Sequence, residues 1–93
     1  MSPTLGLYFD FRNPEPWQRD PAAYYGWHLD LMEDADHRGI GALWATEHHF
    51  VEDGYLPQPL PMLAAIAGRT SQCRLGTGVV ASPLMHPMVI AEQ

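Results

Sequence analysis

The sequence has few of the features that mark secreted, membrane-bound or disulfide-bonded proteins. Its single cysteine, Cys73, cannot form an internal disulfide, and nothing in the sequence indicates an oxidising compartment. The N-terminus has neither the basic region nor the apolar core of a signal peptide. No stretch approaches the ~20 apolar residues that a bilayer-spanning helix needs. These absences predict a cytoplasmic protein in which Cys73 is a buried structural thiol.

Positive charge is also scarce, with five Lys and Arg residues against eleven Asp and Glu and a formal net charge of -6 at pH 7. Proteins that bind nucleic acid or anionic membranes usually carry a clustered basic surface, so neither is an expected partner. Four of the eleven acidic residues lie in one predicted helix, where we expect them to form a solvated face. The hydrophobic content of 46% suffices for a globular core, so disorder is not expected.

Strand-like and helix-like segments alternate along the chain. The expected elements are strand 5–11, helix 21–38, strand 40–46, helix 60–71, strand 74–81 and a helix that begins at 87. The first helix is predicted to begin at Asp20-Pro21, an N-cap followed by proline at the first helical position, and to end at Gly39. Because the chain stops just after the last helix begins, we expect it to be the front piece of a longer protein or a truncated gene product.

The first helix is predicted to be amphipathic. Residues at three- and four-residue spacing form its inward side, and charged residues lie on the other side: Tyr24, Trp27, Leu31 and Ala35 inward; Asp30, Glu33, Asp34 and His37 outward. Trp44 and the aromatic residues of the first strand are predicted to be core residues and not part of a ligand cage.

The alternation of strands and helices calls for a parallel sheet with right-handed crossovers. A closed (β/α) barrel and an open doubly wound sheet both satisfy it. An open dinucleotide-binding sheet would usually have a glycine-rich turn after its first strand, and residues 11–16 contain no glycine. The barrel is therefore favoured. Functional groups of a barrel lie on the loops after the strands, which predicts one rim that carries residues 12–13, 48–49 and 82–86.

The segment Glu47-His48-His49-Phe50 follows the second predicted strand directly. A histidine there can act as general acid or base near neutral pH, and Glu47 can hold its tautomer. Because adjacent residues of an extended segment point to opposite sides, at most one of His48 and His49 should face the barrel axis. Two alternatives remain, namely two hydrogen-bonded rim residues or a zinc site. The latter has neither His-Glu-x-x-His spacing nor a cysteine cluster to support it.

Two glycines, Gly76 and Gly78, interrupt the third predicted strand. Glycine weakens a strand unless another group must approach the backbone closely. Two interpretations are open: the glycines let the second helix pack tightly on the sheet, or they let a flat aromatic ligand lie against the exposed backbone.

Together these segments resemble the N-terminal portion of the luciferase-like, flavin-dependent monooxygenase family, which includes bacterial luciferase. The segments that carry the resemblance are, in order, Phe9-Asp10-Phe11-Arg12-Asn13-Pro14, residues 44–50, Pro59-Leu60 at the start of an alanine-rich helix that leads to Arg69-Thr70-Ser71, residues 74–79 and residues 83–87. The resemblance covers nearly the whole chain. It implies an α/β fold in which residues 1–93 are the N-terminal part of the barrel domain and supply three βα units of a (β/α)8 barrel.

The resemblance also implies an activity and its cofactor. By this resemblance, reduced FMN is expected to react with O2 to a peroxyflavin that oxidises a small organic substrate. The deazaflavin F420 of more distant relatives is disfavoured by the Glu-His-His-Phe sequence. A separate flavin reductase and a second copy of the chain are the implied protein partners. The rival hypotheses are a non-catalytic flavin-binding partner subunit and an inactive fragment.

Site residues follow from the same resemblance. His48 corresponds to the family's histidine near the flavin ring, which acts in acid–base or peroxyflavin-stabilising steps, and Glu47 and His49 are the further catalytic candidates. The backbone of Thr77, Gly78 and Val79 corresponds to the flavin bed. The family often carries a cis peptide bond there, which maps to the Gly78-Val79 bond, and no metal is implied.

Overall fold

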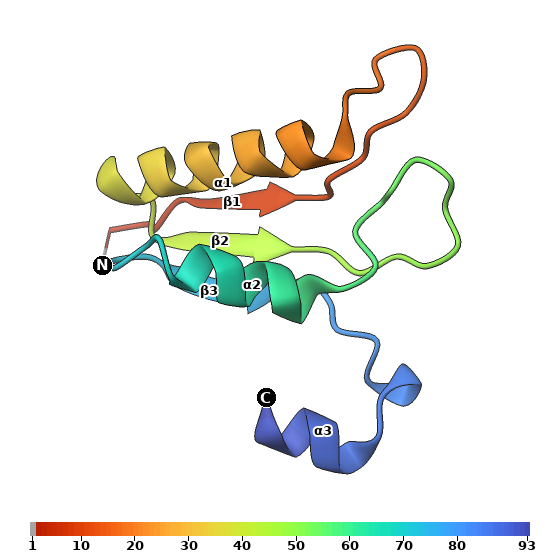
Figure 1. Cartoon of the computed structure of the whole chain (residues 1–93). Coiled ribbons are helices and arrows are strands. Elements are labelled where there is room, and N and C mark those ends of the chain that lie inside the picture. Colours follow the sequence, from red (N-terminus) through yellow and green to blue (C-terminus); the bar gives the residue numbers. More distant parts are fainter. Residues whose placement is uncertain (1) are drawn as a thin grey trace.

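A three-stranded sheet forms the centre of the structure, a computed structural model that describes residues 2–93 (Figure 1). The elements in chain order are β1 (Gly6–Phe9), α1 (Pro21–His37), β2 (Ala42–Ala45), α2 (Pro59–Ala67), β3 (Arg74–Thr77), the 3₁₀ helix η1 (Ser82–Leu84) and α3 (Pro87–Glu92). All three strands are parallel, in the order β1-β2-β3. The predicted alternation and the parallel sheet are therefore confirmed.

The observed elements are shorter than the predicted ones. Each strand has four residues, and the chain leaves the sheet after the last of them. Helix α2 ends at Ala67 and not at residue 71. Its last carbonyls accept from Gly68 and Thr70, and the backbone N–H of Ser71 then donates to the Asp36 carboxylate. A side chain from another helix thus takes over the hydrogen bonding that would have extended α2.

Helix α1 begins as its sequence predicts. Asp20 is the N-cap, and its Oδ2 accepts the backbone N–H of Ala23 at 3.0 Å, while Pro21 occupies the first helical position. Gly39 follows the helix with φ of 85°. That left-handed conformation favours glycine, which explains why the helix ends there.

One face of the sheet is covered by α1 and α2, which lie side by side (Figure 1). Leu43 and Ala45 of β2 point to this side and are completely buried, as is Ile66 of α2. Met32 of α1 and Phe11, just after β1, complete the centre of this core. Burial of these side chains between helices and sheet is the main stabilising contribution.

The predicted inward side of α1 is confirmed at Ala35, which is buried, and is wrong for Trp27 and Leu31, which are exposed. Its buried residues are His28, Met32, Ala35 and Asp36. Trp27 is 54% exposed and lies outside the core. His28 can replace it because its Nδ1 lies 2.9 Å from the Tyr24 carbonyl oxygen, so the buried ring has a hydrogen-bond partner.

The acidic residues of α1 do not form a simple solvated face. Asp36 is completely buried, and its carboxylate accepts the backbone N–H groups of Ser71, Gln72 and Cys73 at 3.0, 3.1 and 2.7 Å. These hydrogen bonds, the one from Ser71 first, lower the pKa of Asp36 from 3.8 to about 2 against the opposing effect of burial. The sequence prediction failed because it treated every acidic residue of the helix as solvated.

Two further acidic residues of α1 pair with Arg69, which follows α2. Its Nη2 lies 2.6 Å from Asp30 Oδ1 and 2.5 Å from Glu33 Oε2. This ion-pair group and Asp36 join the end of α2 to α1. Cys73 is half-buried beside them, and burial raises the pKa of its thiol.

Trp44 and Tyr8 lie on the sheet face opposite α1 and α2, so the prediction that both are core residues is wrong. Tyr8 is 61% and Trp44 is 42% exposed. The two residues are in register on neighbouring strands, and Gly76 is the next residue in the same row. The side-chain alternation of β1 and β2 places these aromatic residues opposite the core residues Leu7 and Leu43.

Gly76 is required by the Trp44 ring, not by helix packing. A Cβ at residue 76 would lie 2.4 Å from Cζ3 of Trp44.

We expect Gly76→Ala to lower the free energy of unfolding by about 1–3 kcal/mol, because the Trp44 ring has to move. Gly26→Ala is the matched control, since nothing lies within 4 Å of a Cβ there. It should stabilise α1 by about 0.4–1 kcal/mol. Urea unfolding of both variants checks this, and equal effects would contradict it.

Helix α3 lies apart from the sheet, beyond the β3 edge, and all its residues are exposed (Figure 1). It begins at Pro87 as predicted, with the His86 ring accepting the Met88 N–H. Across residues 2–93, none of the helices combines the length and the apolar character needed to cross a membrane.

Candidate functional site

The loops after the three parallel strands all leave the sheet at the carboxyl-terminal end of the strands (Figure 1). They contain residues 12–13, 48–49 and 82–86, which confirms that the three predicted segments share one rim. Backbone hydrogen bonds join the first two loops, from Asn13 N–H to the Asp53 carbonyl at 3.0 Å and from Leu56 N–H to the Asp10 carbonyl at 3.3 Å. The rim is therefore a connected set of loops.

His48 lies at the start of the loop after β2. Its ring is parallel to that of Tyr55, with an interplanar angle of 8° and 3.5 Å between the ring centres. Its backbone N–H donates to the Leu56 carbonyl at 2.9 Å. The side-chain Nδ1 is buried, and no hydrogen-bond partner for it exists among the described residues. A buried polar nitrogen without a partner is uncommon in folded proteins. His48 Nδ1 is thus a buried ring nitrogen without a hydrogen-bond partner in residues 2–93.

Glu47 contacts His49 and not His48, so the expectation that Glu47 holds the tautomer applies to the second histidine. Its Oε1 lies 2.6 Å from His49 Nε2, and its Oε2 accepts the backbone N–H of Ala81 at 2.6 Å. Burial raises the pKa of Glu47, but the hydrogen bonds from Ala81 and His49 outweigh it, and the net pKa is lowered. The Glu47 carboxylate therefore stays ionised near neutral pH and ties the loop after β2 to the loop after β3.

The two imidazoles occupy different surroundings. His48 packs on Tyr55, whereas His49 lines a pocket of about 300 Å³ that also contains Val80 and Leu84 from the loop after β3. Phe50, with φ of 58°, is fully exposed at the edge of the same pocket. This separation agrees with the expectation that adjacent residues of an extended segment point to different sides.

The segment 77–79 runs from the end of β3 into its loop. The peptide bond between Gly78 and Val79 is cis, which confirms the position that the family resemblance implied. The Gly78 N–H donates to the Ala45 carbonyl at 2.8 Å, and the Tyr8 hydroxyl donates to the Gly78 carbonyl. A Cβ at residue 78 would lie 2.6 Å from Cε2 of Tyr8. Gly78 therefore admits the Tyr8 ring, while Val79 is 70% exposed.

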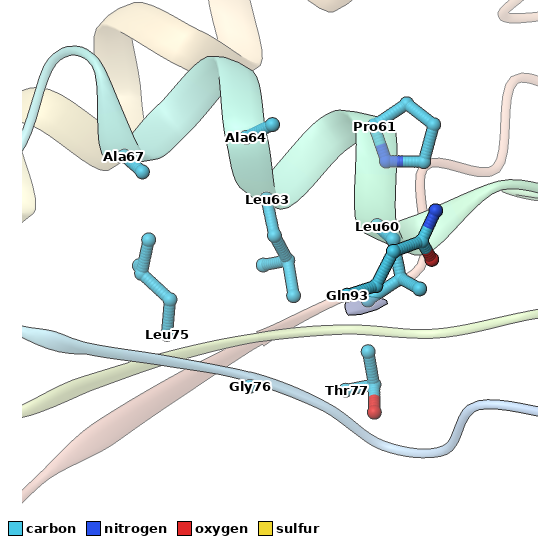
Figure 2. A pocket seen from close by; sticks show the side chains of 9 residues that line it. All are labelled: Leu60, Pro61, Leu63, Ala64, Ala67, Leu75, Gly76, Thr77 and Gln93. Atoms are coloured by element: carbon cyan, nitrogen blue, oxygen red, sulfur yellow. The ribbon is translucent and has the colours of Figure 1, made fainter. Parts of the chain in front are cut away.

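Among the three residues predicted to form the flavin bed, Thr77 differs from Gly78 and Val79 because its side chain points toward α2 (Figure 2). It lines an apolar groove of about 650 Å³ between α2 and β3 together with Leu63, Leu75 and other residues of these elements. None of the lining side chains is titratable. The groove therefore offers no side chain for acid–base chemistry. On the opposite face of the sheet, where the Tyr8 ring lies, Thr77 presents only its backbone.

Sequence reasoning predicted Arg12 as a rim residue but missed its connection to His48 through Tyr55 and Asp53. Tyr55 supplies the stacked ring, and the guanidinium carbon of Arg12 lies 5.1 Å from the centre of that ring. Arg12 in turn forms an ion pair with Asp53, with 2.5 Å between Nη2 and Oδ2. The first two come from different loops, so no sequence spacing indicates the contact. Among residues 2–93, no group of three His, Cys, Asp or Glu side chains could hold a metal ion.

Comparison with known proteins gives a consistent set of relatives. A family model described as "Luciferase-like monooxygenase" matches residues 5–93. The oxygenase component of a flavin-dependent trigonelline monooxygenase from Acinetobacter baylyi is 38% identical over 63 residues, 68% of this chain and 18% of that protein. Limonene 1,2-monooxygenase from Rhodococcus erythropolis is 37% identical over 81 residues, 84% of this chain and 21% of that protein. The chain thus spans about a fifth of the length of these curated relatives.

Solved structures show the same likeness. A monooxygenase from Streptomyces bottropensis matches with a TM-score of 0.83 and 35% identity, over 95% of this chain and 27% of that one. The oxygenating constituent of 3,6-diketocamphane monooxygenase from Pseudomonas putida, solved in complex with FMN, matches with a TM-score of 0.83 and 25% identity. That match covers 98% of this chain and 25% of the other.

Proposed function

Because the chain belongs to the luciferase-like monooxygenase family, we propose that it takes part in the oxidation of a small organic substrate by O2, with reduced FMN as cofactor. The match of the family model from residue 5 to residue 93 is the observation that carries this proposal. The fold is that of three βα units of a (β/α)8 barrel, and three strands alone do not close a barrel. Residues 1–93 are proposed to be the N-terminal part of that barrel domain.

The residues at the rim fit a flavin ring. His48 Nδ1 is a buried nitrogen without a partner in residues 2–93, and the Gly78-Val79 backbone lies at the end of β3 with the Val79 side chain largely exposed. Thr77, Gly78 and Val79 would hold the flavin through their backbone. Reduced FMN, when bound, would supply the two electrons with which O2 is activated. FMN is favoured over F420 because relatives are named as flavin-dependent or solved with FMN.

His48 is proposed to hold or transfer a proton at Nδ1. General acid–base catalysis by a positioned histidine accelerates a reaction by about 10²- to 10⁴-fold. Glu47 and His49 are proposed to act beside it. The ionised Glu47 fixes His49 through Nε2 and fixes the loop after β3 through Ala81 N–H. Glu47 thus joins the loop with the histidines to the loop that follows the proposed flavin bed.

Two protein partners are proposed for the activity. One is a flavin reductase, which the name of the Acinetobacter relative as an oxygenase component supports. The other is a second copy of the chain. The reaction is proposed to take place in the cytoplasm, where a reductase and its nicotinamide cofactor are available.

The experiment that tests the function has two parts. FMN binding to the purified protein is measured by quenching of flavin fluorescence. Oxygen consumption is then recorded with NADH, a flavin reductase and one of three probe substrates, limonene, decanal or trigonelline. Binding together with consumption that rises on addition of a probe supports the monooxygenase. Binding without any such rise supports the non-catalytic flavin-binding subunit instead, and absence of binding contradicts both.

A further inference from the structure

The stack of His48 on Tyr55 depends on a folded loop and not on local sequence. The loop after β2 leaves the sheet with His48 and returns to place Tyr55 against it, with the rings 3.5 Å apart between centres. The return is fixed by the hydrogen bond from His48 N–H to the Leu56 carbonyl. The Leu56 N–H donates to the Asp10 carbonyl, which anchors the same turn to the loop after β1. Both partners of the stack are thus held through their backbones.

Tyr55 is also held through its ring. The Arg12 guanidinium lies 5.1 Å from the ring centre, a distance at which a cation is attracted to an aromatic face. Asp53 fixes that cation, with 2.7 Å between Arg12 Nε and Asp53 Oδ2. Asp53 Oδ1 accepts the backbone N–H of Tyr55 at 3.2 Å. One carboxylate, which is 10% exposed, therefore orients both the cation and the backbone of the residue that the cation contacts.

We infer that Tyr55 is a positioning residue for His48, supported by Arg12 and Asp53. A parallel stack fixes the plane of the imidazole, because the ring cannot rotate about its Cβ–Cγ bond without losing the contact. The free Nδ1 then keeps one direction while a proton is transferred. Small displacements of a reacting group lower rates by large factors, so this restraint matters for the proton transfer at His48. The inference rests on the proposed function, since it assigns Tyr55 a role through His48.

The test uses FMN itself as the probe, so that no organic substrate has to be known. FMN bound to the purified protein is photoreduced and mixed with oxygenated buffer, and the return of oxidised-flavin absorbance gives a rate constant. We expect Tyr55→Leu to change this constant by about tenfold or more, in the same direction as His48→Ala, with the FMN dissociation constant within about threefold of wild type. Tyr55→Phe keeps the aromatic ring, so its rate constant should stay within about twofold of the wild-type value.

A double-mutant cycle separates positioning from an independent effect. In a His48→Ala background, Tyr55→Leu should cause no further change in the rate constant, because the residue through which it acts is gone. A further tenfold change there would overturn the inference. Equal impairment in Tyr55→Phe and Tyr55→Leu would also overturn it. Trp17→Leu, which alters a 76% exposed aromatic residue of the loop after β1, is the control and should behave as wild type.

A second variant covers the case in which Tyr55→Leu does not fold. Arg12→Gln removes the cation from the Tyr55 ring and should change the rate constant by about threefold or more, again only when His48 is present. No change in Arg12→Gln would then overturn the inference. Failure of the proposed function looks different, because the wild-type protein would then bind no FMN, or would bind it without a rise in oxygen consumption on addition of any probe substrate. If FMN binds and His48→Ala alters the rate constant while Tyr55→Leu does not, only the positioning role fails.

Discussion

Replacing His48 with alanine is expected to lower the rate of substrate oxidation by about 100-fold or more while FMN binding changes by less than about threefold. The reason is the proton transfer proposed at Nδ1, a buried nitrogen that has no hydrogen-bond partner in the described chain. His49→Ala should have a smaller effect, because that ring is engaged by Glu47. The measurement is steady-state oxygen consumption with the probe substrate that the wild type oxidises fastest, alongside fluorescence titration with FMN.

His37→Ala is the matched control for this experiment. His37 is the last residue of α1 and is exposed, so its loss should leave both binding and turnover at wild-type values. Unchanged substrate oxidation in His48→Ala would contradict the assigned role of the first histidine. A larger loss in His49→Ala than in His48→Ala would move the role to the second histidine.

The largest effect on stability is expected for Asp36→Ala, which should lower the melting temperature by about 10 °C or more. The substitution removes the buried carboxylate that accepts the backbone N–H groups of Ser71, Gln72 and Cys73, so these three groups lose their acceptor. Asp34→Ala removes the same charge from the same helix. Because Asp34 pairs with Arg38 in an exposed i,i+4 pair, its loss should lower the melting temperature by less than about 3 °C. Calorimetry of both variants checks the contrast, and equal effects would contradict it.

The same carboxylate makes stability depend on pH. Its pKa is lowered to about 2 in the folded protein from 3.8, so folding favours the ionised form. The stabilisation is complete above the unfolded-state pKa and is lost as the pH falls through about 2. We therefore expect the difference in melting temperature between wild type and Asp36→Asn to be constant near neutral pH and to shrink between pH ~4 and pH ~2. A difference that stays constant across that range would show that the charge of Asp36 contributes nothing.

Local signals in the sequence determined the order of the elements and their approximate positions. Asp20-Pro21 starts α1 and Gly39 ends it because capping and left-handed backbone geometry depend on single residues and their immediate neighbours. The strand–helix alternation fixed the parallel sheet, since parallel strands require such crossovers. The Glu47-His48-His49-Phe50 motif could be assigned to the rim for the same reason, because it follows a strand directly.

Contacts between distant segments were decided by the tertiary structure alone. Periodicity places Trp27 inward, and the expectation of a solvated acidic face covers every acidic residue of α1. Trp27 is nevertheless exposed, and Asp36 is buried because the backbone N–H groups after α2 compensate the burial of its carboxylate. The stack of Tyr55 on His48 and the bond from Glu47 to Ala81 likewise join segments whose separation in the chain carries no periodic signal. Local signals therefore predicted which elements form and which end of the sheet carries the candidate site. Only the packing of helices and loops decided which polar groups are buried and paired, because the cost of burying a polar group depends on partners that are distant in sequence.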